Sequence, residues 1–190
     1  MIFTDPILQQ LIQKYPPPTF VDRSNFLFED LLETIISQQL SIKAANTIFE
    51  RFKNLFEKNT FPTPKQILHM DVDKLRSAGI SYQKIGYIKN IAEAFEKNEI
   101  KIEKILTMPD EEIILHLTKL KGVGKWTAEM ILIFTLQRPD VFSFGDLGIR
   151  NAIKKLYNIT DQKEIIKLSE TWKPYRSSAC WYLWRSLENG

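Results

Sequence analysis

The sequence predicts an all-α protein, because apolar residues recur at helical spacing along most of the chain. Leu27, Leu31 and Ile35 lie on one helical face, and Ala45 and Phe49 continue the pattern in a following segment. No segment of useful length alternates apolar and polar residues as a half-buried strand would. Residues that cap helices stand where these periodic segments begin, which gives the predicted helices their starting points.

Capping residues and apolar spacing predict the individual helices in chain order. The run Thr63–Gln66 has the capping-box arrangement, with proline at the first helical position. Asp71 opens a short helix that ends at Gly79, and Ser81 begins the next one. The apolar run from Thr127 to Leu136 predicts a central buried helix. Apolar spacing marks the remaining helices, which lie around Ile88, Ile153 and Leu183.

Composition argues against disulfides, metal sites and membrane association. The 190 residues suffice for one domain or two closely joined lobes, and a net charge of +3 means that nucleic acid would have to bind a local basic face. The single cysteine, Cys180, rules out an internal disulfide and a four-cysteine iron–sulfur cluster, and we expect it to be a small core residue. His69 and His116 stand far apart without nearby cysteine, so we expect no metal site. We find neither an 18-residue apolar run nor a leader, and expect no membrane association.

The most informative segment is Leu120–Ala128, in which Gly122 and Gly124 flank one β-branched residue. This pattern predicts a sharp hairpin between two helices, where glycine permits positive φ and a close approach of the backbone to another surface. The first amides of the following helix have no intrahelical partners and form an anion site. With Lys121 and Lys125 beside them, these amides suit one phosphate of a DNA backbone. An ordinary helical corner, with the glycines as caps, is the alternative.

At these residues the chain resembles the superfamily of DNA glycosylases named for a helix-hairpin-helix, a Gly/Pro-rich loop and an Asp. Leu120–Ala128 resembles the hairpin, and Arg138–Arg150 resembles the loop that carries the catalytic Asp. Ile35–Ala45 resembles the segment that wedges into DNA, and Gly79–Ile88 and Trp172–Trp184 also match. The resemblance runs from about residue 26 to the C-terminus and is closest to the 3-methyladenine DNA glycosylase II type, which removes alkylated bases.

The resemblance implies two helical lobes that flank a DNA-binding cleft. Residues 26–137 would form the lobe with the hairpin, and residues 1–25 with 138–190 would form the second lobe. In this arrangement the phosphate would be bound at Gly122, Gly124, Lys121, Lys125 and Thr127.

Asp146 is the candidate catalytic residue. Cleavage of an N-glycosidic bond builds positive charge on the deoxyribose, and a carboxylate opposite the leaving base can stabilise that charge and orient or deprotonate water. By the resemblance, the loop after the hairpin delivers Asp146 to this position. The alternative is that Asp146 is only the N-cap of the helix that follows it, and both roles are compatible.

Trp126 and Met130 are the candidates for the base pocket. In bifunctional relatives the position of Trp126 holds the lysine that forms a Schiff base with the sugar, so the resemblance implies a hydrolase without lyase activity. Lys125 is one residue out of register. The indole could stack on a flipped cationic base, a contact worth about 1–2 kcal/mol when desolvated, or it could be a core residue. Met130 stands where some relatives carry tyrosine, which leaves the shape of the pocket open.

The wedge segment supplies three candidate DNA contacts. By the resemblance, Gln39 fills the space that the flipped nucleotide leaves, with Gln38 beside it, and Ser41 touches the minor groove. Ser41 could instead cap the helix that begins at Ile42. Near the C-terminus, Arg176 is either a phosphate contact or the partner in an internal ion pair.

Residues and resemblance together predict a monofunctional DNA glycosylase that flips and excises alkylated purines, chiefly 3-methyladenine, and so initiates base excision repair. It would use no cofactor and act as a monomer on double-stranded DNA with damaged bases. We expect it in the cytoplasm, at the nucleoid, or in the nucleus of a eukaryote. Two alternatives stay open: the same hydrolase acting on deaminated or etheno bases, and a catalytically idle module that binds DNA lesions.

Overall fold

The computed structural model of the protein describes residues 3–19, 21–56 and 60–188. Helices and turns make up these three ranges, which contain no strand, so the prediction of an all-α fold is confirmed there. None of the helices in the described part of the chain is long and apolar enough to cross a membrane.

The chain divides into two compact units. Residues 23–131 form the first, which we call the hairpin unit, and residues 1–22 with 132–190 form the second, the terminal unit. The boundaries predicted from the sequence were 26 and 137. Each unit has its own buried apolar core.

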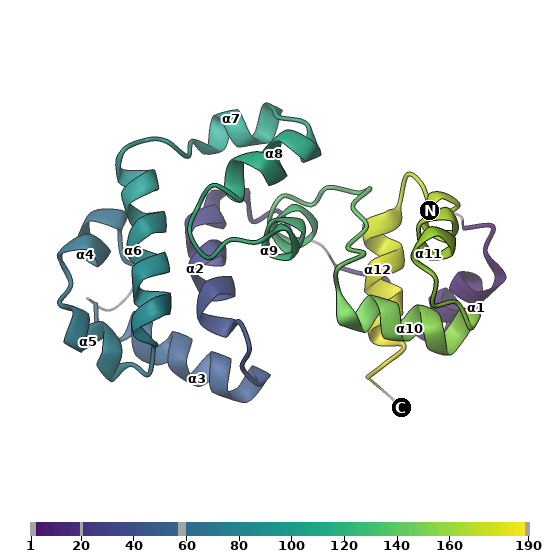
Figure 1. Cartoon of the computed structure of the whole chain (residues 1–190), viewed down its shortest axis with the longest axis horizontal. Helices are drawn as coiled ribbons and strands as arrows, with labels where there is room; N and C mark the ends of the chain where they lie inside the picture. Colours follow the sequence, from purple (N-terminus) through teal and green to yellow (C-terminus); the bar gives the residue numbers. More distant parts are fainter. Residues whose placement is uncertain (1–2, 20, 57–59, 189–190) are drawn as a thin grey trace. The chain divides into compact units, whose positions relative to one another are not determined.

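In the hairpin unit, α6 is the central helix and packs against α2, α4 and α5 (Figure 1). Its apolar face is fully buried, with Ile88 and Ile91 at 0% exposure. The elements of this unit are η1 (Ser24–Phe26), α2 (Leu27–Ser37), α3 (Ile42–Lys53), α4 (Pro64–His69), α5 (Val72–Ser77), α6 (Tyr82–Glu96), α7 (Ile102–Thr107), α8 (Asp110–Leu117) and α9 (Lys125–Met130).

The predicted helix starts of this unit are confirmed by their capping geometry. Thr63 and Gln66 form the reciprocal capping box at α4, and the side chains of Asp71 and Ser81 accept the first backbone N–H groups of α5 and α6. Gly79, just past α5, has a φ of 100°.

The helix predicted from Thr127 to Leu136 is not regular throughout. α9 ends at Met130 and continues as a π-helical turn, η2 (Ile131–Thr135). The apolar pattern predicted burial correctly, since Ile131, Leu132 and Ile133 are at most 1% exposed. It could not predict the wider backbone turn, because both kinds of turn bury the same residues. The boundary between the two units falls inside η2.

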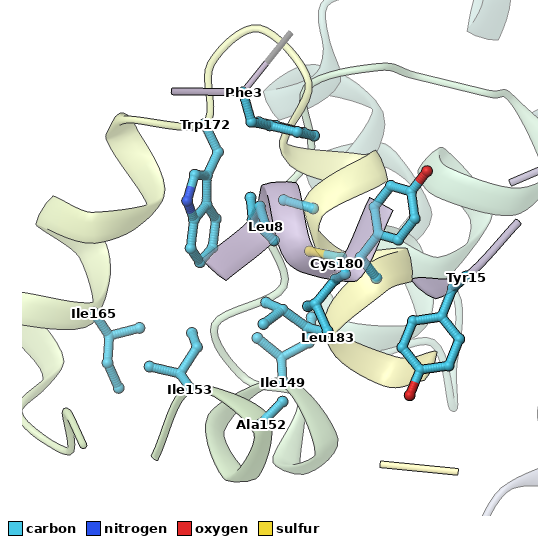
Figure 2. Packing of buried hydrophobic residues seen from close by; sticks show 13 residues of the cluster. Phe3, Leu8, Tyr15, Ile149, Ala152, Ile153, Ile165, Trp172, Cys180 and Leu183 are labelled. Atoms are coloured by element: carbon cyan, nitrogen blue, oxygen red, sulfur yellow. The ribbon is translucent and has the colours of Figure 1, made fainter. Parts of the chain in front are cut away.

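The terminal unit packs four helices around one apolar core: α1 (Pro6–Lys14), α10 (Leu147–Tyr157), α11 (Gln162–Glu170) and α12 (Arg176–Arg185). Figure 2 shows side chains from all four helices pointing toward one another, among them Leu8, Ile153, Ile165 and Leu183. Cys180 lies in this core and is fully buried, as predicted.

Asp5 joins the N-terminal segment to the rest of the terminal unit. Its Oδ1 accepts the N–H groups of Ile7 and Leu8 at the start of α1. Its Oδ2 accepts the hydroxyl of Tyr157 and the Nε1–H of the fully buried Trp172, both at 2.9 Å. Burial raises the pKa of the Tyr157 phenol well above its usual range, and the Asp5 charge adds to the shift, so this hydroxyl stays a donor.

Candidate functional site

The two hairpin glycines differ in conformation and in surroundings. Gly122 has a φ of +87°, and a Cβ added there would lie 2.3 Å from Cδ2 of Tyr87. Gly124 has a φ of −87° and a ψ of 173°, serves as the N-cap of α9, and has open space around the position of a Cβ. The expectation of positive φ was therefore right for Gly122 and wrong for Gly124. The turn reverses at Gly122, and the chain is already extended at Gly124.

Gln38 and Thr127 hold the hairpin from the inside. The Nε2 of Gln38 donates to the backbone carbonyl of Gly122 at 3.2 Å and to the hydroxyl oxygen of Thr127 at 3.3 Å. Thr127 is 2% exposed, so its side chain is not on the surface. Both side chains therefore make contacts within the hairpin unit, and the DNA contacts predicted at Gln38 and Thr127 stay predictions. At Thr127 the contact would have to come from the backbone, in the first turn of α9, because the side chain is buried.

Two lysines border the hairpin on its surface. The side chain of Lys121 is exposed, while its backbone N–H donates to Oδ1 of Asn90 at 2.8 Å. The side chain of Lys125 is 76% exposed and its Nζ lies 3.8 Å from Oε1 of Glu129, whose side chain is 5% exposed. The buried carboxylate of Glu129 was not among the site residues predicted from the sequence. The i, i+4 spacing of Lys125 and Glu129 on one helical face could have indicated this ion pair from the sequence.

The turn between α2 and α3 (residues 38–41), which we call the α2–α3 turn, is half-buried at Gln38 and exposed at the three residues that follow. Gln39 has a left-handed backbone, with a φ of 58°, and is exposed together with Leu40 and Ser41. The hydroxyl of Ser41 accepts the N–H of Ala44 at 3.3 Å, so Ser41 does cap α3. Ile42, the first residue of α3, is 82% exposed. The side chain of Gln39 is thus exposed, and its entry into DNA stays a prediction.

Trp126 and Met130 lie one helical turn apart on α9 and share a face. Trp126 is 40% exposed, which is not the environment of a core tryptophan, and Met130 is half-buried. The two candidate pocket residues are therefore neighbours on the hairpin unit.

In the terminal unit, Asp146 is the N-cap of α10 and is held by two donors. Its Oδ1 accepts the backbone N–H of Ile149 at 2.8 Å and the Nε1–H of Trp184 at 2.9 Å. The Trp184 ring in turn packs against Phe134, with centroids 5.6 Å apart. Gly148 makes room for this arrangement, because a Cβ there would lie 3.0 Å from Oδ1 of Asp146. The N-terminus of a helix is also a favourable place for negative charge.

The contact of Trp184 with Asp146 was not predicted from the sequence. Arg176 is now resolved as an internal ion-pair partner. Its Nε donates to Oδ1 of Asp140 at 2.8 Å, and its Nη1 lies 3.3 Å from Oε1 of Glu170.

Within the described ranges, no group of three or more His, Cys, Asp or Glu side chains is arranged to hold a metal ion.

Comparisons with known proteins match nearly the whole chain. A family model described as "HhH-GPD superfamily base excision DNA repair protein" matches residues 32–175. DNA-3-methyladenine glycosylase 1 of Schizosaccharomyces pombe is 40% identical over 183 residues, covering 94% of this chain and 80% of that protein. The solved structure of the Schizosaccharomyces pombe 3-methyladenine DNA glycosylase in complex with abasic DNA has a TM-score of 0.86 and 38% identity, covering 96% and 92% of the two chains. A DNA-3-methyladenine glycosidase structure from Bacillus halodurans has a TM-score of 0.83 and 34% identity, covering 97% and 86%.

The contrast between the two hairpin glycines predicts unequal costs of substitution. Gly122→Ala should lower the free energy of unfolding by about 3 kcal/mol, because it combines a left-handed backbone with a clash against Tyr87. Gly124→Ala, the matched control, should cost under about 1 kcal/mol, since only a weaker N-cap results. Denaturant unfolding of both variants measures the difference. Equal costs would mean that the backbone at Gly122 can relax.

Proposed function

Because the chain belongs to the HhH-GPD superfamily of base excision DNA repair proteins, we propose that it is a DNA glycosylase that hydrolyses the N-glycosidic bond of alkylated purines, chiefly 3-methyladenine. The single observation that carries the proposal is Asp146, a carboxylate oriented by two hydrogen-bond donors at the N-terminus of α10. The names of the relatives at 34–40% identity support the substrate class. Base release from a panel of DNA duplexes with alkylated, etheno and deaminated bases is the direct test.

Asp146 is proposed to act on the sugar. As the bond between C1′ and the base breaks, its electron pair leaves with the base and positive charge develops on the deoxyribose. The Asp146 carboxylate stabilises this charge and accepts a proton from the water that adds to C1′. The Trp184 Nε1–H and the Ile149 N–H keep the carboxylate in one orientation through the reaction. The products are a free base and an abasic site.

An alkylated purine such as 3-methyladenine carries a positive charge in DNA and leaves as a neutral molecule, so its departure needs little help from a general acid. Recognition can then rest on aromatic contact. We assign this role to Trp126, whose partly exposed indole is able to stack on a flipped cationic base, with Met130 beside it on the same face.

DNA binding is proposed to involve two surface elements of the hairpin unit. The backbone around Gly124 is open to a phosphate, with Lys121 and Lys125 supplying positive charge nearby. These contacts place the DNA without reading its sequence. Gln39 is the residue proposed to enter the duplex, because its side chain is exposed at the left-handed position of the α2–α3 turn.

Asp146→Asn tests the catalytic assignment. Base release should fall about 10²–10³-fold, because a neutral amide stabilises the sugar cation poorly. Asparagine is a good N-cap, so the fold and the affinity for DNA with an abasic analogue should persist. Asp161→Asn, which makes the same change at the N-cap of α11, is the matched control and should release base at the wild-type rate. Wild-type release by Asp146→Asn would refute the assignment.

The absence of a lysine at position 126 predicts hydrolysis without strand cleavage. During base excision, borohydride should trap no covalent complex between protein and DNA, and the product strand should break only after heat or alkali. A relative with lyase activity serves as the positive control. A trapped complex that disappears in Lys125→Ala would show that Lys125 reaches the sugar.

Gly124→Val tests whether the hairpin backbone contacts a phosphate. The variant should fold, since the backbone is extended there and no atom lies within 4 Å of the new Cβ. Its affinity for DNA should fall about tenfold or more, because the side chain keeps the phosphate from the amides. For comparison, Lys121→Ala should weaken binding on all sequences alike and reduce the salt slope by about one. If a folded Gly124→Val protein binds DNA with unchanged affinity, the hairpin backbone does not contact a phosphate and only connects two helices.

A further inference from the structure

One face of α6 contacts both surface elements of the hairpin unit that are proposed to bind DNA. Lys84, Tyr87 and Asn90 follow one another at three-residue steps and therefore lie along one side of the helix. The Tyr87 ring lies against Gly122, and Oδ1 of Asn90 accepts the backbone N–H of Lys121. These two residues hold the hairpin, and Lys84 holds the α2–α3 turn.

Lys84 binds the C-terminal end of α2 through its ammonium group. The Nζ donates to the backbone carbonyls of Ile36 and Gln38, each at 2.7 Å. The last carbonyls of a helix have no intrahelical partner, so these two bonds satisfy groups that would otherwise need water. Burial lowers the pKa of Lys84, which reflects the cost of bringing its charge out of solvent to this position.

Gln38 completes the connection between the α2–α3 turn and the hairpin. Its backbone carbonyl is held by Lys84, while its side chain donates to Gly122 and Thr127. The next residue is Gln39, whose side chain is proposed to enter the duplex. The position of Gln39 relative to the hairpin thus depends on the two ends of Gln38.

We propose that Lys84 is a positioning residue for base flipping: by fixing the backbone of Gln38, it keeps Gln39 in register with the phosphate-binding hairpin. The α2–α3 turn and the hairpin then keep a fixed relative position while Gln39 enters the duplex and the hairpin binds the phosphate. The inference rests on the proposed function. The proposed role of Lys84 is more specific than stabilisation of the fold, because its ammonium group binds the backbone of Gln38, the residue directly before Gln39.

The same helix provides a matched control. Lys89 Nζ donates to the carbonyls of Leu68 and Met70 at the end of α4, at 3.3 and 2.9 Å. Lys89→Met therefore removes the same kind of helix-end contact, but α4 is not among the elements proposed to contact DNA. Lys84→Met and Lys89→Met should reduce thermal stability to similar extents.

The decisive measurements are single-turnover base release from alkylated duplex DNA and the fluorescence of 2-aminopurine placed opposite an abasic analogue. Lys84→Met should lose about 10–100-fold in release rate, as expected for a misplaced binding element. At saturating protein it should also lose the fluorescence change that reports contact with the partner base. Lys89→Met should retain the rate and the fluorescence change. If the two variants behave alike, the inference is wrong.

Gln38→Leu provides a second test should Lys84→Met fail to fold. It removes only the link to the hairpin and should show the same two losses, and the double variant should be no worse than either single variant because both act through one connection. Normal rate and fluorescence in Gln38→Leu would overturn the inference. Wild-type protein that gives the fluorescence change but releases no base would instead count against the proposed function, leaving the positioning role of Lys84 to be judged from fluorescence alone.

Discussion

A left-handed glycine pressed against an aromatic ring is the constraint on which the surface of the hairpin unit depends. At Gly122 there is no room for a Cβ, because the Tyr87 ring occupies that space. This close approach brings the hairpin near enough to α6 for Asn90 to accept the Lys121 N–H. It also presents the Gly122 carbonyl to the side chain of Gln38. A bulkier residue would separate the hairpin from α6 and remove these contacts together.

In the terminal unit, too, a glycine stands where a Cβ would be crowded, here beside the carboxylate of Asp146 and without a left-handed backbone. Gly148 is small enough for the Trp184 indole to reach Asp146, and the N–H of Ile149 reaches the same oxygen from the helix. Capping and catalysis are therefore compatible roles for Asp146, since the cap is part of what orients the carboxylate. Asp5 is likewise an N-cap whose carboxylate accepts further side-chain hydrogen bonds, and we assign it no catalytic role. One of its oxygens caps α1 and the other accepts from the side chains of Tyr157 and Trp172.

Features that depend on neighbouring residues in the sequence were predictable, and features that depend on distant residues were not. The capping box at Thr63 and the cap at Ser81 follow from local chemistry, so the sequence predicted them. Gln38 looked like a surface residue because its partners, Gly122 and Thr127, lie far along the chain. The sign of φ at Gly124 depends on which residue reverses the chain. Because Gly122 and Gly124 can both adopt a positive φ, the sequence does not say which of them does. Trp184 and Asp146 meet only after α10 and α12 have packed.

The geometry of α9 is the physical basis for the proposal that the protein lacks lyase activity although a lysine stands next to Trp126. Successive residues of a helix differ by about 100° in direction, so Lys125 and Trp126 belong to different faces. Lys125 shares its face with the buried carboxylate of Glu129, whose Oε1 lies 3.8 Å from its Nζ. Trp126 shares its face with Met130. By the resemblance to bifunctional relatives, a Schiff base with the sugar would require the amine on the face of Trp126. On that face the chain presents an indole and a thioether, which cannot form that bond.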